Sequence, residues 1–181
     1  KTAEASEVNF IPFSQEELVV IASPRHPIAA QKNVSVSELS TEPFIMKEAG
    51  SGTRRRVNIL FDQHRCAPTI LMETSNNEFI KQLVQRGEGV SLLVREAVTE
   101  ELKGKRLAAV TLKGQKVYLD VNIAYLKDQV LSPPAKAFVD TLIGLKSDDL
   151  HPMGIGLMMA KMLAQRKEEQ RKISRGKGSR Q

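Results

Sequence analysis

Short apolar runs alternate along the chain with segments in which apolar residues recur every three or four positions. The runs are rich in β-branched residues and typical of buried strands, whereas the longer spacing is typical of amphipathic helices. Strands are predicted at residues 17–22, 43–46, 69–73, 90–94, 106–112 and 117–126. Helices are predicted at residues 35–40, from about 53, and at 75–87, 95–102 and 132–144. Short connections from strand to helix to strand predict parallel βαβ units and an α/β fold.

The turn Glu48–Arg56 comes directly before the first long helix. Its two glycines, Gly50 and Gly52, permit a tight backbone path, and Ser51 or Thr53 can accept hydrogen bonds from the free N–H groups of the helix. The predicted buried face of this helix holds Val57, Leu60, Phe61 and, at its end, His64. Free N–H groups and the helix dipole favour a bound anion, and the alternative is a solvated helix cap that binds nothing.

A second turn of the same kind follows the next strand. Ser75 and Glu78 have the Ser-x-x-Glu spacing of a capping box. The predicted buried stripe of its helix is Phe79, Ile80, Leu83 and Val84, and Gly87 is the predicted end. In a parallel sheet both turns would lie at the carboxyl edge, where α/β folds bind ligands. The two turns offer hydroxyls, amides and helix starts but no reactive groups. This combination favours reversible binding of a small anion over catalysis.

Candidate catalytic groups are loosely arranged in the sequence. Ser51 stands in Gly-Ser-Gly, which lacks the Gly-x-Ser-x-Gly spacing of a nucleophile elbow. Asp62, His64 and Glu73 are conceivable as an acid–base set, although the first two belong to a surface-facing helix end. His26 has no partner ligand nearby in sequence. We therefore predict no catalytic residue, no metal and no cofactor, and an enzyme using Ser51 is the alternative.

Composition argues against a disulfide-built, a membrane-spanning and a base-stacking protein. The chain has 181 residues and is 41% hydrophobic, enough for a moderate core without disulfides. Its lone cysteine, Cys66, is predicted to pack passively in a reducing compartment. No run approaches the length of a membrane span, and the amino terminus lacks a signal pattern, which predicts a cytoplasmic protein without membrane contact. Aromatic residues make up only 4%, which argues against a base-stacking surface.

The net charge of +6 is concentrated at the carboxyl end. Residues 146–181 hold nine Lys or Arg and four Asp or Glu, so residues 1–145 are almost neutral. Residues 146–154 are predicted to end the compact domain, and the remainder is predicted to be a basic tail, helical or disordered. The basic tail has an apolar stripe and could contact nucleic acid, lipid or a protein partner. The alternative is that the tail packs on its own domain.

The order of five segments resembles the effector-binding domain of LysR-type transcriptional regulators. They are ELVVIASPRHPI (17–28), PFIMKEAGSGTR (43–54), METSNNEFIK (72–81), GEGVSLL (87–93) and LSPPAKAF (131–138). The match covers about residues 8–145. It implies a fold similar to type 2 periplasmic binding proteins, with a mixed, mostly parallel sheet flanked by helices. Residues 1–145 would hold mainly the second lobe, its return strand and its closing helix.

The resemblance also implies a function and a site. Ser51, Gly52, Thr53, Ser75 and Asn76 would line one wall of a cleft for a small organic or inorganic anion, and the opposite wall would be missing. The winged helix-turn-helix that binds DNA and most of the first lobe would lie before Lys1. Inducer binding would close the lobes of a dimer or tetramer and change how it holds DNA. The alternative is a solute-binding protein of a transport system, which should carry an export signal.

Two features depart from the family pattern. Val94 and Arg95 stand where members often have a proline after the strand, so the family does not predict the form of this turn. The basic tail is longer than the family usually carries, and its role therefore does not transfer.

Overall fold

The computed structural model describes residues 7–144. The described residues fall into two units: unit 1, residues 7–14 with 122–144, and unit 2, Gln15–Val121. Unit 2 contains both predicted turns. The predicted tail lies outside the described residues, so the domain boundary at residue 145 stays a prediction. Within residues 7–144, no helix has the length and apolar character needed to cross a membrane.

Unit 2 is built on a mixed β-sheet, to which β1 and β7 contribute part of their length. The strands of the chain are β1 (Val8–Ala22), β2 (Asn33–Val34), β3 (Pro43–Lys47), β4 (Thr69–Thr74), β5 (Ser91–Val94), β6 (Ala108–Leu112) and β7 (Val117–Leu126). β1 pairs antiparallel with β5 and β6, and β2 runs parallel to β6. β3 and β4 are parallel, and Phe44 makes a parallel bridge to Val90 just before β5. The predicted α/β class and mixed sheet are confirmed.

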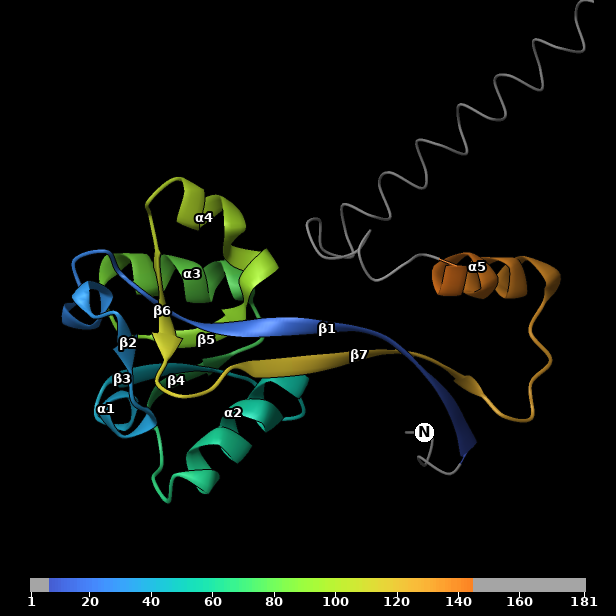
Figure 1. Cartoon of the computed structure of the whole chain (residues 1–181), viewed down its shortest axis with the longest axis horizontal. Helices are drawn as coiled ribbons and strands as arrows, with labels where there is room; N and C mark the ends of the chain where they lie inside the picture. The colour runs from blue at the N-terminus through green and yellow to red at the C-terminus, as the bar shows by residue number, and fades with distance from the viewer. Residues whose placement is uncertain (1–6, 145–181) are drawn as a thin grey trace, which may run out of the picture. The chain divides into compact units, whose positions relative to one another are not determined.

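Helices cover both faces of this sheet. They are η2 (Pro27–Ala30), α1 (Val36–Ser40), α2 (Gly52–Gln63), α3 (Asn77–Arg86), η3 (Arg95–Val98) and α4 (Thr99–Lys103). In Figure 1, α2 lies on one side of the sheet, and α3 and α4 lie on the other. Neighbouring residues of a strand point to opposite faces. Phe44 therefore packs in the cluster that includes Phe61 of α2, and Ile45 packs in the cluster that includes Ile80 of α3.

Several elements differ from the prediction in where they begin or in how they are divided. β1 begins at Val8, well before the predicted residue 17, because its early residues are only partly buried and are recognisable as strand through pairing with β7. The predicted helix 95–102 is divided into the 3-10 turn η3 and the α-helix α4. β6 begins at Ala108 instead of 106, since the N–H groups of Arg106 and Leu107 donate to the Glu101 carbonyl and form a turn.

The described residues of unit 1, 7–14 and 122–144, include the helix α5 (Pro133–Gly144). The Ser132 carbonyl accepts a hydrogen bond from Lys136 N at 2.8 Å, and two prolines follow Ser132 in the first turn. Apolar residues recur at helical spacing along α5, yet Leu142 is buried whereas Phe138 and Ile143 are exposed. Helical spacing determines which side chains share a face, but a neighbouring element must cover that face to bury it.

Candidate ligand site

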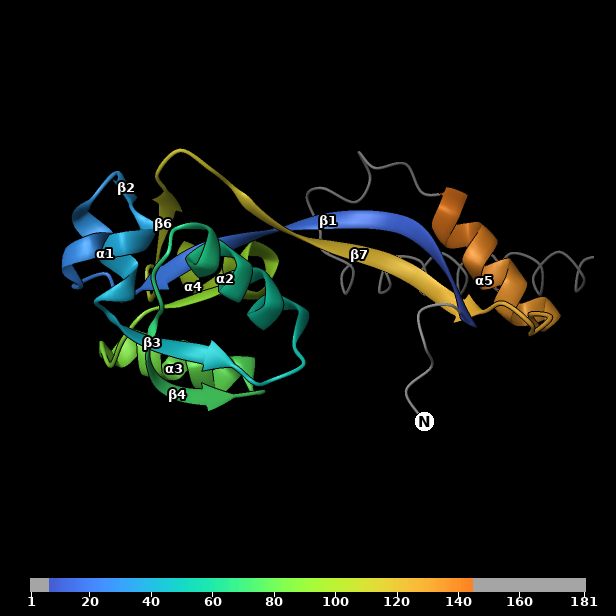
Figure 2. The same ribbon diagram turned by 90° about the horizontal axis from the view of Figure 1, so that it is seen from below.

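The two predicted turns meet at one edge of unit 2. Lys47, the last residue of β3, is in register with Thr74, the last residue of β4. Because the two strands are parallel, the chain leaves both at the same carboxyl edge and enters α2 and α3 there. Figure 2 shows β3 and β4 side by side with their ends pointing the same way. The structure therefore places the predicted site residues at the edge where α/β folds bind ligands.

The first turn leaves hydrogen-bond donors free at the start of α2. Gly50 has φ +89°, a conformation that favours glycine, and Ser51 is the N-cap with an extended backbone. The first helical bond runs from Arg55 N to Ser51 O at 3.0 Å. The Ser51 side chain makes no capping hydrogen bond, so the predicted side-chain cap is wrong at this residue. The N–H groups of residues 52–54 precede the helical ladder and can donate to another acceptor.

The second turn is capped one residue later than predicted. Asn76 Oδ1 accepts a hydrogen bond from Phe79 N at 3.1 Å, and Asn76 N donates to Thr74 Oγ1 at 3.2 Å. The predicted Ser75–Glu78 capping box is therefore wrong, because the amide of Asn76 takes the capping position and the Thr74 hydroxyl turns the backbone before it. Phe79, predicted to be buried, is largely exposed in the first turn of α3.

Lys47 and Arg54 tie the two turns together. Lys47 Nζ donates to the Ser75 carbonyl and, at 3.0 Å, to Asn77 Oδ1. Arg54 donates to Lys47 O at 3.1 Å and lies 2.6 Å from Glu73 Oε1. The Arg54 guanidinium is thus bonded to the Lys47 carbonyl and to the Glu73 carboxylate. Sequence reasoning missed Lys47, whose only signal is a cation at the end of a buried apolar strand.

The five predicted ligand residues differ in what they can still bind. Asn76 uses its Oδ1 in the cap and keeps only its amide NH₂ group. The hydroxyls of Ser51, Thr53 and Ser75 have no hydrogen-bond partner within residues 7–144. A Cβ built on Gly52 would lie 3.1 Å from a methyl carbon of Leu119, so the start of α2 lies close to β7. The edge therefore offers hydroxyl, amide and backbone donors on half-buried or exposed residues.

Local charges nearly balance at this edge. Lys47 lies 3.4 Å from Glu48 Oε2, and Arg54 pairs with Glu73. Any preference for an anion therefore comes from the N–H groups and dipole of α2 more than from excess cations. Glu96 follows β5 at the same edge and has a buried oxygen, Oε2, without a hydrogen bond to the described residues. Burial raises the pKa of its carboxyl, the Glu16 carboxyl raises the pKa further, and Arg95 opposes both.

The described residues do not form the acid–base set or the metal site considered as alternatives. His64 is exposed and not buried as predicted. Its Nδ1 lies 2.8 Å from Leu60 O, and its Nε2 lies 3.2 Å from Gln115 Nε2. It is thus engaged apart from Glu73, which binds Arg54. His26 Nδ1 accepts from Ile28 N at 3.3 Å and caps η2. The described part of the chain holds no group of three or more side chains that could bind a metal ion.

Comparison with known proteins gives the family. The model of the LysR substrate binding domain matches residues 2–145. The chain belongs to this family. The LysR domain is a ligand-binding module of transcription regulators, so the recognition made from the five segments and the prediction of a non-enzymatic chain are confirmed.

Relatives of this LysR domain include an HTH-type transcriptional activator and regulators of RuBisCO operons. The chain is 38% identical over 136 residues to the HTH-type transcriptional activator CmpR of Synechocystis, and the match covers 75% of this chain and 45% of CmpR. It is 33% identical over 136 residues to a RuBisCO operon transcriptional regulator of Acidithiobacillus ferrooxidans, covering 75% and 44%. The chain thus spans less than half the length of these relatives.

Solved structures share the LysR effector-binding fold. The regulatory domain of Synechocystis CcmR in complex with 2-PG has a TM-score of 0.68 and 32% identity, covering 79% of this chain and 69% of that one. The effector-binding domain of QuiR in complex with shikimate has a TM-score of 0.70 and 22% identity, covering 78% and 66%. These similarities confirm the periplasmic-binding-protein-like fold expected from the sequence.

Proposed function

We propose that this LysR domain senses a small anion at the two turns that begin α2 and α3. The observation that carries the proposal is the set of open donors there: the N–H groups of residues 52–54 and the hydroxyls of Ser51, Thr53 and Ser75. A carboxylate or phosphate is the acceptor that such a helix start favours. CcmR, at 32% identity, was solved with 2-phosphoglycolate, which supports an anionic effector without placing it here.

The two side chains that tie the turns together preorganise this site. Lys47 and Arg54 hold the β3–α2 and β4–α3 turns in one arrangement before any ligand arrives. Donors that are already positioned bind an anion without a further cost of ordering the backbone. One wall cannot enclose a ligand, so tight binding requires the opposing lobe of the whole regulator. Effector binding would then shift the balance between two states of the regulator.

The first prediction concerns Thr53. In the regulator that contains this chain, Thr53→Val is expected to weaken binding of 2-phosphoglycolate or a related small anion by about tenfold. Valine keeps the shape of threonine and removes a hydroxyl that would donate to a charged oxygen. Isothermal titration calorimetry measures the effect, with Ser75→Ala as a second test of the same wall.

A matched control for Thr53→Val is Thr111→Val, because Thr111 is an exposed residue of β6 away from the turns. The control should leave the affinity for the same anion unchanged. Unchanged affinity in both Thr53→Val and Ser75→Ala would reject the assigned wall.

The proposal also covers DNA binding and the cellular location of the whole regulator. The relatives are named as DNA-binding regulators of the HTH type, so we propose that a winged helix-turn-helix joined to this domain contacts DNA in the cytoplasm. Reading the coding sequence before Lys1 tests this, and absence of such a domain would contradict it. A solute-binding protein of a transport system, the alternative from sequence, is disfavoured by membership of the LysR family.

We also propose that copies of the domain associate through β4 and α3. Within the described residues β4 pairs only with β3, so it is an edge strand with free backbone groups. A register shift leaves Leu71 unpaired, and its side chain is 54% exposed. Ile70 and Phe79, each 41% exposed, add apolar surface on β4 and the start of α3. Exposed apolar side chains beside an open strand edge favour a protein partner.

The second prediction tests this edge with two isoleucines of equal exposure. Ile70→Lys, on β4, is expected to convert the oligomer to a smaller species, because a charge would be buried at the interface. Ile59→Lys, on α2 with 40% exposure, should leave the oligomer unchanged. Sedimentation velocity distinguishes the species. Equal behaviour of the two variants would place the interface elsewhere.

A further inference from the structure

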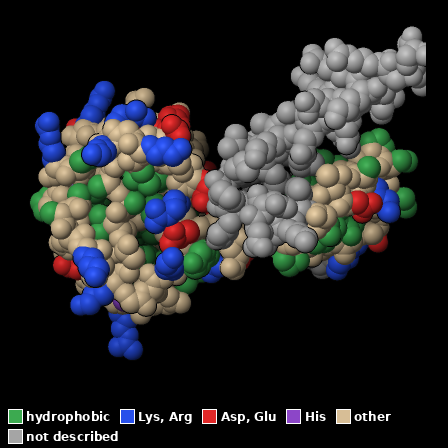
Figure 3. All heavy atoms as spheres, turned by 45° about the horizontal axis from the view of Figure 1, so that its top comes forward, with side chains coloured by type: hydrophobic (Ala, Val, Ile, Leu, Met, Phe, Trp, Pro, Cys, Tyr) green, Lys and Arg blue, Asp and Glu red, His purple; other side chains and the backbone are tan. Residues whose placement is uncertain are grey.

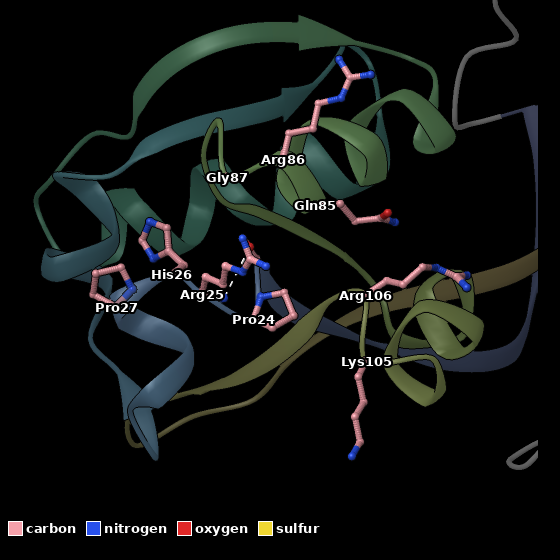
Figure 4. Close-up of a pocket in the computed structure, with 10 residues that line it drawn as sticks. Pro24, Arg25, His26, Pro27, Gln85, Arg86, Gly87, Lys105 and Arg106 are labelled. Carbon is pink, nitrogen blue, oxygen red and sulfur yellow. Dashed lines mark hydrogen bonds between the residues drawn. The ribbon is translucent and has the colours of Figure 1, made fainter.

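A hollow lies in unit 2, away from the two turns. It has a volume of about 640 Å³ and lies between the turn after β1, the end of α3 and the turn between α4 and β6 (Figure 4). Its lining contains no Asp or Glu but includes four cationic residues, Arg25, Arg86, Lys105 and Arg106. These cations come from three segments that only the fold brings together.

Three of these four cations have no counter-charge among the described residues. Among the residues that the structure describes, Arg25, Arg86 and Lys105 form no ion pair, and the carboxylate of Glu101 lies 3.7 Å from Arg106. Cations gathered around a hollow repel one another, and an anion in the hollow would relieve that repulsion. This surface therefore differs from the edge before α2 and α3, where Lys47 and Arg54 have acidic partners.

The backbone that carries the first of these cations is well held. Ser23 is buried, its carbonyl accepts a hydrogen bond from His26 N at 2.9 Å, and its Oγ accepts one from Arg25 N at 3.4 Å. Pro24 and Pro27 restrict the backbone on either side. The position of the turn is thus set by local bonds, while the long cationic side chains around the hollow are exposed to solvent.

The side chains spread around the hollow. In Figure 4, Arg25 lies near Pro24 at the middle of the group, whereas Arg86 and Lys105 extend in opposite directions. A single compact ion such as sulfate could not reach all of them at once. A ligand with several charged groups could draw them together, since arginine binds phosphate through two parallel N–H···O bonds.

We propose that this hollow is a second ligand site that takes a small molecule with two or more phosphate groups. Gly87 precedes β5, which is parallel to β3. The hollow therefore lies at the opposite end of the parallel strands from the edge with the turns before α2 and α3, the candidate effector edge. Duplex DNA would present a convex rod to a concave site. On the face in Figure 3, moreover, the Lys and Arg side chains of unit 2 are separated by neutral and acidic ones and form no continuous basic stripe.

Calorimetric titration of the full 181-residue chain with inorganic tripolyphosphate tests the proposal. The double variant Arg25→Gln with Arg86→Gln is expected to raise the dissociation constant at least about tenfold, since two charge-assisted contacts are lost. The matched control, Arg55→Gln with Lys113→Gln, removes the same charge from exposed positions outside the hollow and should change it less than about twofold. All four residues are exposed, and circular dichroism confirms that each variant is folded.

Further titrations distinguish a nucleotide from DNA as the phosphate ligand, and they distinguish the hollow from the site at the two turns. A nucleoside triphosphate should compete with tripolyphosphate, and a short duplex DNA should not. Thr53→Val, at the candidate effector edge, should leave tripolyphosphate binding unchanged. The proposal is overturned by no binding at millimolar concentration, by equal loss in the test and control variants, by loss in Thr53→Val alone, or by binding of DNA in place of tripolyphosphate.

Discussion

Replacing Lys81 with alanine is expected to lower the free energy of unfolding by about 3 kcal/mol, because the buried Glu101 carboxylate keeps only the more distant guanidinium of Arg106, 3.7 Å away, as a counter-ion. Lys81 belongs to α3, and only 8% of its side chain is exposed. Its Nζ lies 2.6 Å from Glu78, 3.0 Å from Glu101 and 3.3 Å from the Ala97 carbonyl. Burial alone would lower the pKa of Lys81, but hydrogen bonds to the two glutamates raise it above its ordinary value. Urea denaturation measures the loss.

The control for Lys81 is Lys103→Ala, which removes a surface pair with Glu100 at 3.2 Å and should change stability by less than about 1 kcal/mol. Adding Glu101→Gln to Lys81→Ala should recover part of the loss, since no buried charge is left. Burial would raise the pKa of Glu101, but Lys81 holds it below the ordinary 4.5. The wild-type contribution is therefore complete above pH 4.5 and lost as the pH falls through the lowered pKa. A loss from Lys81→Ala no larger than that of Lys103→Ala would contradict the buried ion pair.

Replacing Gly89 with alanine is expected to destabilise the fold by about 3 kcal/mol, through a clash with the backbone of β3. A Cβ on Gly89 would lie 2.3 Å from the Pro43 carbonyl oxygen and 3.0 Å from its carbon. Neither atom can rotate away as a side chain can. The same Pro43 oxygen accepts a hydrogen bond from Val90 N at 2.8 Å, and Ile45 N donates to Val90 O at 2.8 Å. Moving Pro43 would weaken the contact that joins β3 to β5.

Gly52→Ala is the matched control for Gly89→Ala. The nearest atom to its new Cβ is the end of the Leu119 side chain, at 3.1 Å, and alanine favours a helix more than glycine does. Thermal unfolding should therefore show a change below about 1 kcal/mol for Gly52→Ala and a much lower melting temperature for Gly89→Ala. Similar melting temperatures would show that β3 can shift to accommodate the added carbon.

The local course of the chain could be predicted in much of unit 2. Ser35 caps α1 and bonds reciprocally with Glu38, and Gly87 ends α3 with φ +84°. Such features depend on residues three or four positions apart, so the sequence pattern contains the whole cause. The caps of α2 and α3 were predicted less well. Ser75 and Asn76 are both suitable caps one residue apart, and the Thr74 hydroxyl, together with the amide of Asn76, favours the second.

The candidate effector edge was predicted in position but not in chemistry. Parallel βαβ spacing placed the turns before α2 and α3 together, and the structure puts Lys47 opposite Thr74. The pattern did not show that Lys47 and Arg54 bond across these turns, because their partners are up to 30 residues away. The hollow with Arg25 and Arg86 was missed for the same reason, since each cation alone resembles an ordinary surface residue.

The sequence by itself determined the α/β class, the order of most strands and helices and the membership of the LysR family, because periodicity, turn residues and short motifs act over a few neighbouring positions. Only the tertiary structure decided which donors stay open, which cations are bonded and why particular positions must be glycine. Gly89 shows the reason: its motif is visible in the sequence, but the carbonyl of Pro43 that excludes a side chain comes from a distant strand. Contacts between remote residues depend on the packed fold, which local patterns do not specify.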